Sequence, residues 1–459
     1  MLKKNDQITV DIERFGSECG IAHLDGMTLF VLGALPGEKV VARVQKVEKK
    51  YAFLKTLEVL QAHPQRAVPP CPYYEKCGGC AAQHMEYALS LQMKREKVQD
   101  ALARIGGLSV EVPMPLGMAD PFHYRNKTAL PVGEKDGKVQ MGFYAPRSHR
   151  IVDIDRCLIS KEESNQVLQT VRSWMEKFQI SPYNEVTRKG LVRHVMSRVS
   201  KQGDVMAVLV AAAPSLPHSR ELIAMLRAQL EGLKSVYLNV NRRGDNVILG
   251  TENHLLFGEE RMQDTLLGLS FSVSPLSFFQ VNPVQTEVLY QTALDFADLK
   301  STETVADLYC GAGTISLLLA QKAKQVIGIE IVPPAIEDAK ENARANGIEN
   351  VQFHAAAAEE LLPKLVQQGL KPDVVMLDPP RKGCEEAVLE AICQCSPEKV
   401  VYISCDVATQ ARDAKYLTAH GYAAQKCQSV DMFCLTSHIE NVLLFVKAQE
   451  EKNEYLCNP

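Results

Sequence analysis

From residue 283 onward the chain alternates helices with short apolar strands, and this alternation restricts the possible folds more than any other feature of the sequence. The pattern predicts helices over 283–298, 313–322 and 334–346, with strands at "TVADLYC", "QVIGIE", "VQFHAA", "DVVMLD", "VVYISC" and "NVLLFVK". Strands that alternate with helices form a largely parallel, doubly wound sheet. Because such a sheet binds ligands at the carboxyl ends of its strands, functional residues are expected directly after them.

The sequence before this region divides into two further parts. Residues 1–60 alternate in period two between glycine-rich turns, which predicts a small closed β-barrel of the OB-like kind. Residues 61–270 begin with a proline- and glycine-rich segment that carries cysteines and then mix strands with helices, which predicts an α+β domain. The remainder, 271–459, is expected to form a Rossmann-like α/β domain. We therefore predict a multidomain protein with three domains.

Composition indicates a cytoplasmic protein. The first residues lack the apolar core of a signal peptide, and the longest apolar run, "MAVLVAAAP", is too short to span a bilayer. Thiols stay reduced in the cytosol, so clusters among the thirteen cysteines are expected to be metal ligands or nucleophiles. We expect no membrane partner, and a monomer is the default expectation.

The overall charge gives no sign of nucleic-acid binding. The net charge is −4, so binding to RNA would depend on local basic patches. Three segments are candidates, although a charge run is more often a solvated face: "KVEKKYAFLK" (46–55), "HYRNKT" (123–128) and "RKGLVRHVMSR" (188–198).

A glycine turn and two strand-end acids indicate a cofactor site. In "VADLYCGAGTISLLLA", Gly311 and Gly313 permit a tight turn before a helix N-terminus, but the third glycine of a dinucleotide fingerprint is missing. Glu330 ends the next strand, where an acid can accept hydrogen bonds from ribose hydroxyls. Asp378 ends the strand in "DVVMLDPPRKG". In this order the three motifs resemble an S-adenosylmethionine (AdoMet) methyltransferase core; the alternative is a generic nucleotide fold with surface acids.

Cys405 follows the apolar strand "VVYIS" and is either a small core residue or a nucleophile. A thiolate is useful for a substrate such as carbon-5 of uracil, because its addition to carbon-6 creates an enolate that can attack a methyl group. A base must then remove the carbon-5 proton. In "TSHIENVLLFV", Glu440 is our choice for this base, with His438 as the alternative. Arg381, rather than an aromatic residue, follows Asp-Pro-Pro, which disfavours amino-group methylation.

Five segments together resemble the RNA uracil carbon-5 methyltransferase family: "SFFQVN" (277–282), "DLYCGAGTISL" (307–317), "LDPPRKG" (377–383), "YISCD" (402–406) and "HIENV" (438–442). The resemblance implies Cys405 as nucleophile and Glu440 as base. It also implies AdoMet contacts from four residues: Gln280, Tyr309, Glu330 and Asp378. An everted target uridine could stack on an aromatic side chain such as Phe279, although Phe279 could equally be a core residue.

The segment "CPYYEKCGGC" places Cys71, Cys77 and Cys80 in a C-x5-C-x2-C spacing typical of metal ligands, and Cys157 in "DIDRCLIS" is the candidate for a fourth ligand. The spacing does not distinguish zinc from an iron–sulfur cluster. The family resemblance implies a 4Fe–4S cluster on this pattern, with a structural or RNA-contacting role.

The first 60 residues resemble a TRAM domain, for which an RNA-gripping role is expected through Lys and Arg contacts to phosphates. A TRAM-like barrel with a four-cysteine cluster resembles the 23S rRNA branch of the family, so 23S rRNA is preferred over transfer RNA as the partner. Two alternatives remain, an amino-group methyltransferase acting on an RNA base and a non-catalytic RNA-binding protein.

Overall fold

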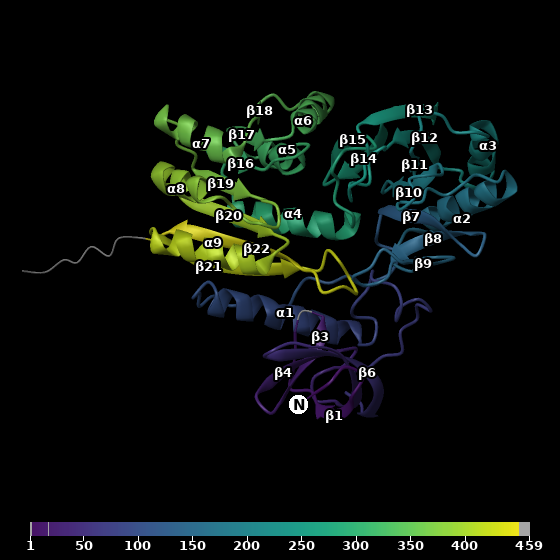
Figure 1. Ribbon diagram of the computed structural model, residues 1–459. Helices are drawn as coiled ribbons and strands as arrows, with labels where there is room; N and C mark the ends of the chain where they lie inside the picture. Colours follow the sequence, from purple (N-terminus) through teal and green to yellow (C-terminus); the bar gives the residue numbers. More distant parts are fainter. Residues whose placement is uncertain (1, 17, 449–459) are drawn as a thin grey trace, which may run out of the picture.

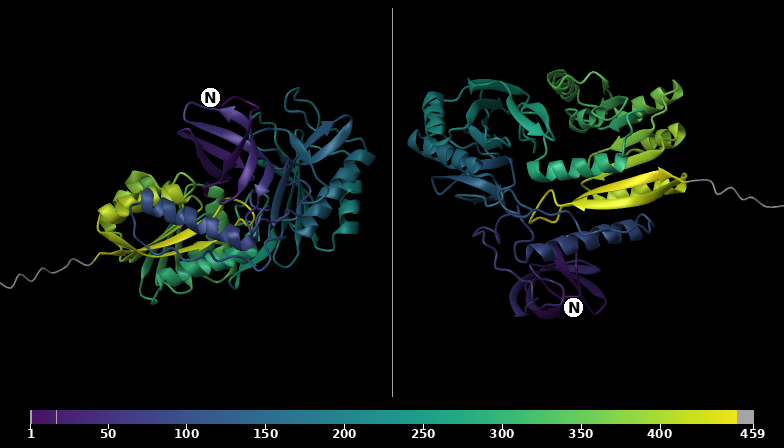
Figure 2. Two further views of the ribbon diagram at one scale, coloured as in Figure 1. Left: turned by 90° about the horizontal axis from the view of Figure 1, so that it is seen from below. Right: turned by 180° about the vertical axis from the view of Figure 1, so that it is seen from behind.

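The computed structural model describes residues 2–16 and 18–448 and arranges them in three bodies (Figure 1). The N-terminal barrel lies below, and the central and C-terminal domains lie side by side above it, as the views in Figure 2 also show. No helix in the described residues is long and apolar enough to cross a membrane.

Six strands build the barrel: β1 (Gln7–Asp11), β2 (Arg14–Phe15), β3 (Cys19–Leu24), β4 (Met27–Leu32), β5 (Lys39–Val47) and β6 (Tyr51–Gln61). They lie in the order β1-β5-β6-β4-β3-β2. Because β1 and β2 follow each other in the chain but occupy opposite edges of this order, the sheet closes on itself. In β5, Val40, Ala42 and Val44 face the interior and are fully buried. The predicted OB-like barrel is confirmed.

Helix α1 (Tyr87–Arg104) connects the barrel to the rest of the chain and packs against α9 (Val407–Ala419) of the C-terminal domain. Its buried residues Val98 and Leu102 belong to the hydrophobic core of that domain. The helix is therefore physically part of the C-terminal body, although its residues lie within the 61–270 range expected for the central domain.

A buried ion pair fixes α1 in this position. Lys94 Nζ donates to Asp431 Oδ1 at 2.6 Å, and the two side chains are 5% and 0% exposed. Lys94 Nζ also donates to the Phe433 carbonyl, and the Tyr87 hydroxyl donates to Asp431 Oδ2 at 2.8 Å. Both oxygens of the carboxylate thus have partners, as a buried charge requires.

The central domain is a seven-stranded sheet with two helices. Its elements are β7 (Lys127–Lys135), β8 (Lys138–Tyr144), β9 (Ile151–Asp153), α2 (Glu162–Lys177), β10 (Val192–Val199), β11 (Val205–Ala211), α3 (Ser219–Gln229), β12 (Leu233–Val240) and β13 (Glu252–Gly258). The order is β13-β12-β11-β10-β7-β8-β9. The fully buried Trp174 of α2 lies in the core between helices and sheet. A hairpin of β14 (Met262–Leu266) and β15 (Leu269–Val273) then packs on α6 (Pro333–Ala345) of the last domain.

The C-terminal domain confirms the predicted Rossmann-like fold. Its elements are α4 (Pro283–Ala297), β16 (Thr304–Leu308), α5 (Thr314–Ala320), β17 (Gln325–Glu330), α6 (Pro333–Ala345), β18 (Val351–Ala355), α7 (Ala358–Gln367), β19 (Val374–Leu377), α8 (Glu386–Cys395), β20 (Lys399–Ser404), α9, β21 (Tyr422–Val430) and β22 (Glu440–Lys447). The strand order is β18-β17-β16-β19-β20-β22-β21. All neighbours up to β20 are parallel, whereas β22 runs antiparallel between β20 and β21.

The ion pair between α1 and the C-terminal domain makes a stability prediction. Replacing Lys94 with Met leaves the Asp431 carboxylate buried without its counter-charge, so the C-terminal domain should lose about 3 kcal/mol of unfolding free energy. Urea unfolding followed by circular dichroism measures this change. The only tryptophan, Trp174, lies in the core of the central domain, so its fluorescence follows the unfolding of that domain separately. The urea concentration at the midpoint of this fluorescence transition should change little.

The exposed Lys322→Met is the matched control, and the double variant Lys94→Met/Asp431→Asn, which removes both charges, should recover part of the loss. An unchanged circular-dichroism transition in Lys94→Met would show that the pair does not hold the helix in place.

Candidate active site

Cys405 lies between the end of β20 and the start of α9. The Asp406 carboxylate caps α9 by accepting hydrogen bonds from the backbone N–H groups of Ala408 and Thr409, at 3.0 and 3.1 Å. The Ser404 hydroxyl accepts from the Asp406 N–H at 3.1 Å and so holds the turn between strand and helix. The half-buried thiol is therefore placed directly before a helix N-terminus, a position that favours a thiolate.

Glu440 begins β22 and is only 3% exposed. Because β22 runs antiparallel to β20, the first residues of β22 lie beside the last residues of β20, and Ser404 is directly opposite Asn441. The strand pairing therefore brings Cys405 and Glu440 to the same edge of the sheet from positions far apart in the sequence. No hydrogen bond joins the Glu440 carboxylate to another described residue, so it is available to a substrate.

The pKa values of these two groups show that they share one environment. Burial and the nearby carboxylates of Glu440 and Asp378 raise the pKa of the Cys405 thiol to about 11, against the opposing effect of Arg381. Burial and Asp378 raise the pKa of Glu440 well above its usual value, again opposed by Arg381. The thiol is therefore protonated in the free protein at neutral pH, and a positive charge in the site would favour its ionisation.

A buried amide pair fixes the relative position of the two strands. Gln410 Nε2 of α9 donates to the carbonyls of Tyr402 and Asn441, at 2.8 and 3.1 Å. In return, Asn441 Nδ2 donates to Gln410 Oε1 at 2.8 Å, and the Ser429 hydroxyl donates to Asn441 Oδ1 at 2.7 Å. These bonds join β20, α9, β21 and β22 next to Glu440. No local pattern in the sequence points to Asn441 or Gln410, since their hydrogen bonds form only in the folded domain.

The predicted glycine turn follows β16 and bends sharply. Tyr309, Gly311 and Gly313 all have positive φ values, of 67°, 54° and 80°. A Cβ atom on Gly313 would approach Ala339 Cβ and Phe353 Cζ to 2.9 Å, whereas a Cβ on Gly311 would meet nothing within 4 Å. Gly313 is thus required for packing, and Gly311 borders open space where a ligand can approach the backbone.

Three carboxylates gather at the ends of adjacent parallel strands. Glu330 of β17 accepts hydrogen bonds from the N–H groups of Gly311 and Val332, at 3.1 and 2.9 Å, and retains lone pairs for a ligand. Burial raises the pKa of Asp378, after β19, to about 7. Asp307, near the end of β16, is fully buried, and the sequence motifs did not single it out. Burial, together with Asp378 and Glu330, raises its pKa to about 7.

Asp307 is also incompletely satisfied. Its Oδ2 accepts a hydrogen bond from the Ser316 hydroxyl, but its buried Oδ1 has no partner among the described residues. Clustered acids with a free acceptor suit the positively charged sulfonium and ammonium groups of AdoMet. The carboxylate groups at this edge therefore fit the predicted cofactor, AdoMet.

The segment 274–282 borders this edge and carries two aromatic residues, Phe278 and Phe279, which differ in burial. Phe279, the expected stacking candidate, is partly buried against the core, with its ring centroid 6.1 Å from that of Phe271. Phe278 is 70% exposed. The half-buried Gln280 lies near the hydroxyl of the buried Tyr290, whose pKa is raised by burial and by Asp378. Gln280 is thus placed beside the acids, and Phe278 is the aromatic that a base could reach.

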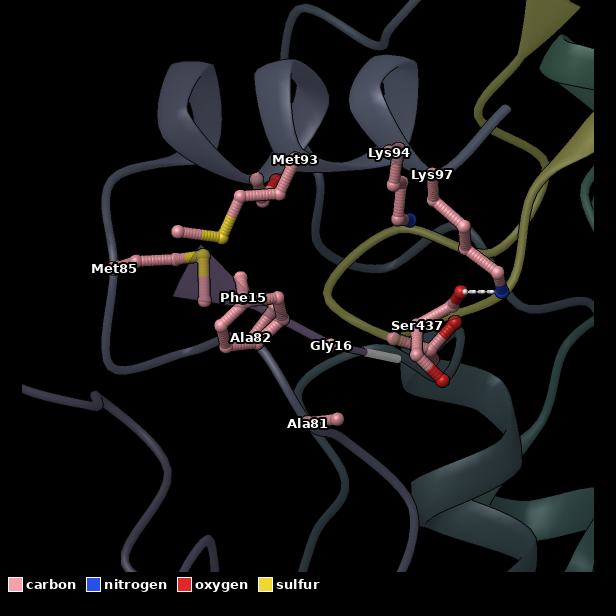
Figure 3. A pocket seen from close by; sticks show the side chains of 11 residues that line it. Phe15, Gly16, Ala81, Ala82, Met85, Met93, Lys94, Lys97 and Ser437 are labelled. Carbon is pink, nitrogen blue, oxygen red and sulfur yellow. Dashed lines mark hydrogen bonds between the residues drawn. The ribbon is translucent and has the colours of Figure 1, made fainter. Parts of the chain in front are cut away.

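The loop before Glu440 is held by the N-terminal parts of the chain. Lys97 Nζ of α1 donates to the Ser437 carbonyl at 3.0 Å (Figure 3). The Ser437 hydroxyl donates to Glu18 of the barrel at 3.1 Å. A cavity of about 20 Å³ at this junction has room for about one water molecule, so it is not the substrate pocket. His438 packs edge-on against Phe433, and burial and nearby cations lower its pKa.

The four predicted metal-binding cysteines lie near one another. Cys157 raises the thiol pKa values of Cys71, Cys77 and Cys80 by its charge, although burial is the larger cause for each. Cys157 is held by Asn165, whose Oδ1 accepts from its N–H at 2.8 Å. In the described part of the chain, however, no three His, Cys, Asp or Glu side chains are arranged to hold a single metal ion.

Comparison with known proteins identifies two sequence families in the chain. The profile of the tRNA (uracil-5-)-methyltransferase family matches residues 86–448, and the TRAM domain profile matches residues 2–53. The chain is 48% identical to an uncharacterized RNA methyltransferase of Clostridium tetani, over 98% of both chains. It is 47% identical to an uncharacterized RNA methyltransferase of Halalkalibacterium halodurans, over 96% of this chain and 97% of that protein.

One solved structure resembles almost the whole chain. It is the tRNA (uracil-54, C5)-methyltransferase of Pyrococcus abyssi in complex with S-adenosyl-L-homocysteine. The TM-score is 0.77 with 26% sequence identity, over 96% of this chain and 100% of that one.

The shared environment of Cys405 and Glu440 predicts a change in thiol reactivity. Glu440→Gln removes a negative neighbour, so the pKa of the Cys405 thiol should fall by about one unit and its alkylation by iodoacetamide should accelerate up to tenfold. The rate is measured from pH 7 to 10 by mass spectrometry of the peptide that contains Cys405. Glu386→Gln on the exposed start of α8 should leave the rate unchanged. Equal rates in Glu440→Gln and the unaltered protein would place the two groups too far apart to interact.

Proposed function

Because the chain belongs to the tRNA (uracil-5-)-methyltransferase family, we propose that it transfers the methyl group of AdoMet to carbon-5 of a uridine in 23S rRNA. The observation that carries this proposal is the placement of the Cys405 thiol and the Glu440 carboxylate at one sheet edge, by the pairing of β20 with β22. A nucleophile and a base beside a cofactor site are what methylation of an unreactive alkene carbon requires.

In this mechanism the half-buried Cys405 thiol releases its proton to solvent, and the thiolate sulfur bonds to carbon-6 of the everted uracil. The electron pair of the 5,6 double bond moves toward the ring carbonyl, and carbon-5 becomes nucleophilic. Carbon-5 would bond to the methyl group that bound AdoMet supplies, and the electron pair of the broken sulfur–methyl bond would leave with neutral S-adenosylhomocysteine. Glu440 then takes the proton from carbon-5, the carbon–sulfur bond breaks and the double bond forms again.

The charges around the site support an ordered activation. Glu440 and Asp378 disfavour the Cys405 thiolate in the free protein. A cationic cofactor beside these carboxylates would offset them, and the N-terminus of α9 would stabilise the thiolate that forms. The thiol would therefore become reactive only when the methyl donor is in place. We propose six residues for holding the cofactor: Gln280, Tyr309, Gly311, Gly313, Glu330 and Asp378.

The choice of 23S rRNA rests on the TRAM barrel and the four cysteines, a combination that resembles the ribosomal RNA branch of the family. A second candidate is the same reaction on transfer RNA, which the likeness to the Pyrococcus abyssi tRNA enzyme favours. For either RNA the barrel offers a stacking surface of Phe30, Tyr51 and Phe53, with Arg147 5.0 Å above the Phe53 ring. Aromatic rings next to cations suit unpaired bases and their phosphates.

Transfer of label to RNA tests the proposed reaction. The protein is incubated with AdoMet labelled in its methyl group and, separately, with unmodified 23S rRNA and transfer RNA, and the nucleosides are then analysed. We expect 5-methyluridine from 23S rRNA and none from the Cys405→Ala variant. Glu440→Gln, which cannot take the carbon-5 proton, should leave RNA attached to the protein on a denaturing gel.

The half-buried Cys393→Ala on α8 is the matched control and should keep full activity. Label in 5-methyluridine of transfer RNA alone would agree with the mechanism and would show that the substrate is transfer RNA rather than 23S rRNA. Label in another nucleoside, or activity that survives in Cys405→Ala, would contradict the thiolate mechanism and favour amino-group methylation at Asp378. AdoMet binding without any transfer would favour a non-catalytic RNA-binding protein.

We also propose that Cys71, Cys77, Cys80 and Cys157 hold a 4Fe–4S cluster. The fold places the distant Cys157 within electrostatic reach of the other three thiols, and four thiolates are the usual ligand set of such a cluster. The methylation needs no electron transfer, so the cluster would serve to shape the loop that contacts the barrel, the central domain and RNA.

Metal analysis tests this assignment. Protein purified without oxygen should contain about four iron and about four labile sulfide atoms per chain, and Cys80→Ala should lose most of both. Cys19→Ala, in the barrel, is the control and should keep them. Zinc in place of iron, or iron unchanged in Cys80→Ala, would exclude this cluster on these ligands.

A further inference from the structure

Two cations lie opposite each other on neighbouring inner strands of the central sheet, at the strand ends that are next to the segment 275–281. Lys127 of β7 and Arg198 of β10 are direct partners in the antiparallel register, so their side chains lie on the same face of the sheet. Arg125 joins them, because its Nε donates to the Lys127 carbonyl at 2.9 Å. Like charges directly opposite each other destabilise a sheet unless an anion is bound between them.

Protein carboxylates do not supply that anion. None of the ion pairs in residues 2–16 and 18–448 includes Arg125, Lys127 or Arg198. Arg198 is 3% exposed and donates to the carbonyls of Pro275 and Ser277, while its buried Nε has no partner there. Burial lowers the pKa of Arg198 to about 10.

Lys127 and Arg125 are only partly buried, unlike Arg198. The Nζ of Lys127 makes no hydrogen bond with another described residue. Burial is the main cause that lowers its pKa to about 7, followed by the charges of Arg198 and Arg125, with no acid acting in the opposite direction. An ammonium group in this position gains its full charge when an anion approaches it.

The group adjoins the segment that borders the active site. Asn126, between Arg125 and Lys127, donates from its N–H to the Val281 carbonyl at 2.8 Å and from Nδ2 to the Gln280 carbonyl at 3.2 Å. Arg198 holds the same segment through Ser277. The exposed Phe278 projects from this segment. An anion on Lys127 would therefore lie beside the segment that carries Phe278 and Gln280.

We propose that Lys127, supported by Arg125 and Arg198, binds a backbone phosphate of the RNA strand next to the target nucleotide. This inference rests on the proposed function, since it takes RNA as the substrate. A phosphodiester keeps its charge at all relevant pH values and can approach the partly exposed ammonium from solvent. The other candidate anion is the carboxylate of AdoMet, but the cofactor edge is formed by Asp307, Glu330 and Asp378 of a different sheet.

Binding of unmodified 23S rRNA to the full chain tests the proposal. Lys127→Met should weaken this binding about tenfold at low salt and reduce the slope of log affinity against log salt by about 0.7, the contribution of one single-strand phosphate. Lys138→Met is the matched control, because Lys138 is exposed on the same sheet at the far end of the β7–β8 hairpin. Its affinity and slope should equal those of the unaltered protein.

The melting temperature and the pH dependence of RNA affinity distinguish a phosphate-binding Lys127 from a lysine that only stabilises the fold. Lys127→Met removes a like-charge contact, so its melting temperature should stay equal or rise. In the unaltered protein RNA affinity should fall as the pH rises through 7, because Lys127 loses its charge, whereas Lys127→Arg should keep its affinity up to pH 8. The charged groups that act on Lys127 are Arg198 and Arg125, and no acidic group acts on it.

Outcomes against the proposal are distinct from a failure of the methylation test. RNA binding by Lys127→Met that matches the unaltered protein in affinity and salt slope would overturn it, even if 5-methyluridine is formed. Weaker equilibrium binding of AdoMet with unchanged RNA binding would also overturn it and assign the lysine to the cofactor carboxylate. Weaker RNA binding with a smaller slope supports the phosphate site, whichever nucleoside is labelled in the methylation test.

Discussion

The antiparallel insertion of β22 between β20 and β21 is the constraint on which the proposed chemistry depends. If the strand ran parallel to its neighbours, its first residue would lie at the opposite edge of the sheet from Cys405. The reversed direction instead places Glu440 beside the thiol, and the Asn441–Gln410 amide pair locks the register. The proposed nucleophile, directly after β20, and the proposed base, at the start of β22, are thus held by two paired strands, which limits their relative motion.

The two N-terminal parts of the chain act on the loops that flank this edge. Helix α1 holds the loop before Glu440 through Lys94 and Lys97, and the barrel reaches the same loop through Glu18. From the other side, Asn126 and Arg198 of the central domain bind carbonyl groups of the segment 275–281. Both loops are therefore shaped by domains that carry no catalytic residue, and RNA bound to those domains would lie next to the site.

Negative and positive side chains form separate groups around the proposed site, which the net charge of −4 does not reveal. Carboxylates gather at the strand ends, where they suit a cationic methyl donor: Asp307, Glu330, Asp378 and Glu440. Cations lie on neighbouring segments: Lys97 of α1, Lys127 and Arg198 of the central sheet, and Arg381 after Asp378. Burial and the carboxylates of Glu440 and Asp378 raise the pKa of the Cys405 thiol to about 11. In the proposed mechanism, its reactivity would therefore depend on the arrival of positive charge.

The sequence by itself determined the elements and their motifs, because hydrophobic period, glycine turns and strand-end residues are local properties. The expected helix 334–346 is α6 (Pro333–Ala345), and the barrel and the doubly wound sheet form as predicted. Only the tertiary structure decided which distant residues meet. It joined α1 to the C-terminal domain, exposed Phe278 rather than Phe279, and left Asp307 with a free oxygen beside two other acids. It also set Lys127 against Arg198, since strand pairing, burial and electrostatic contact arise between segments that no local pattern connects.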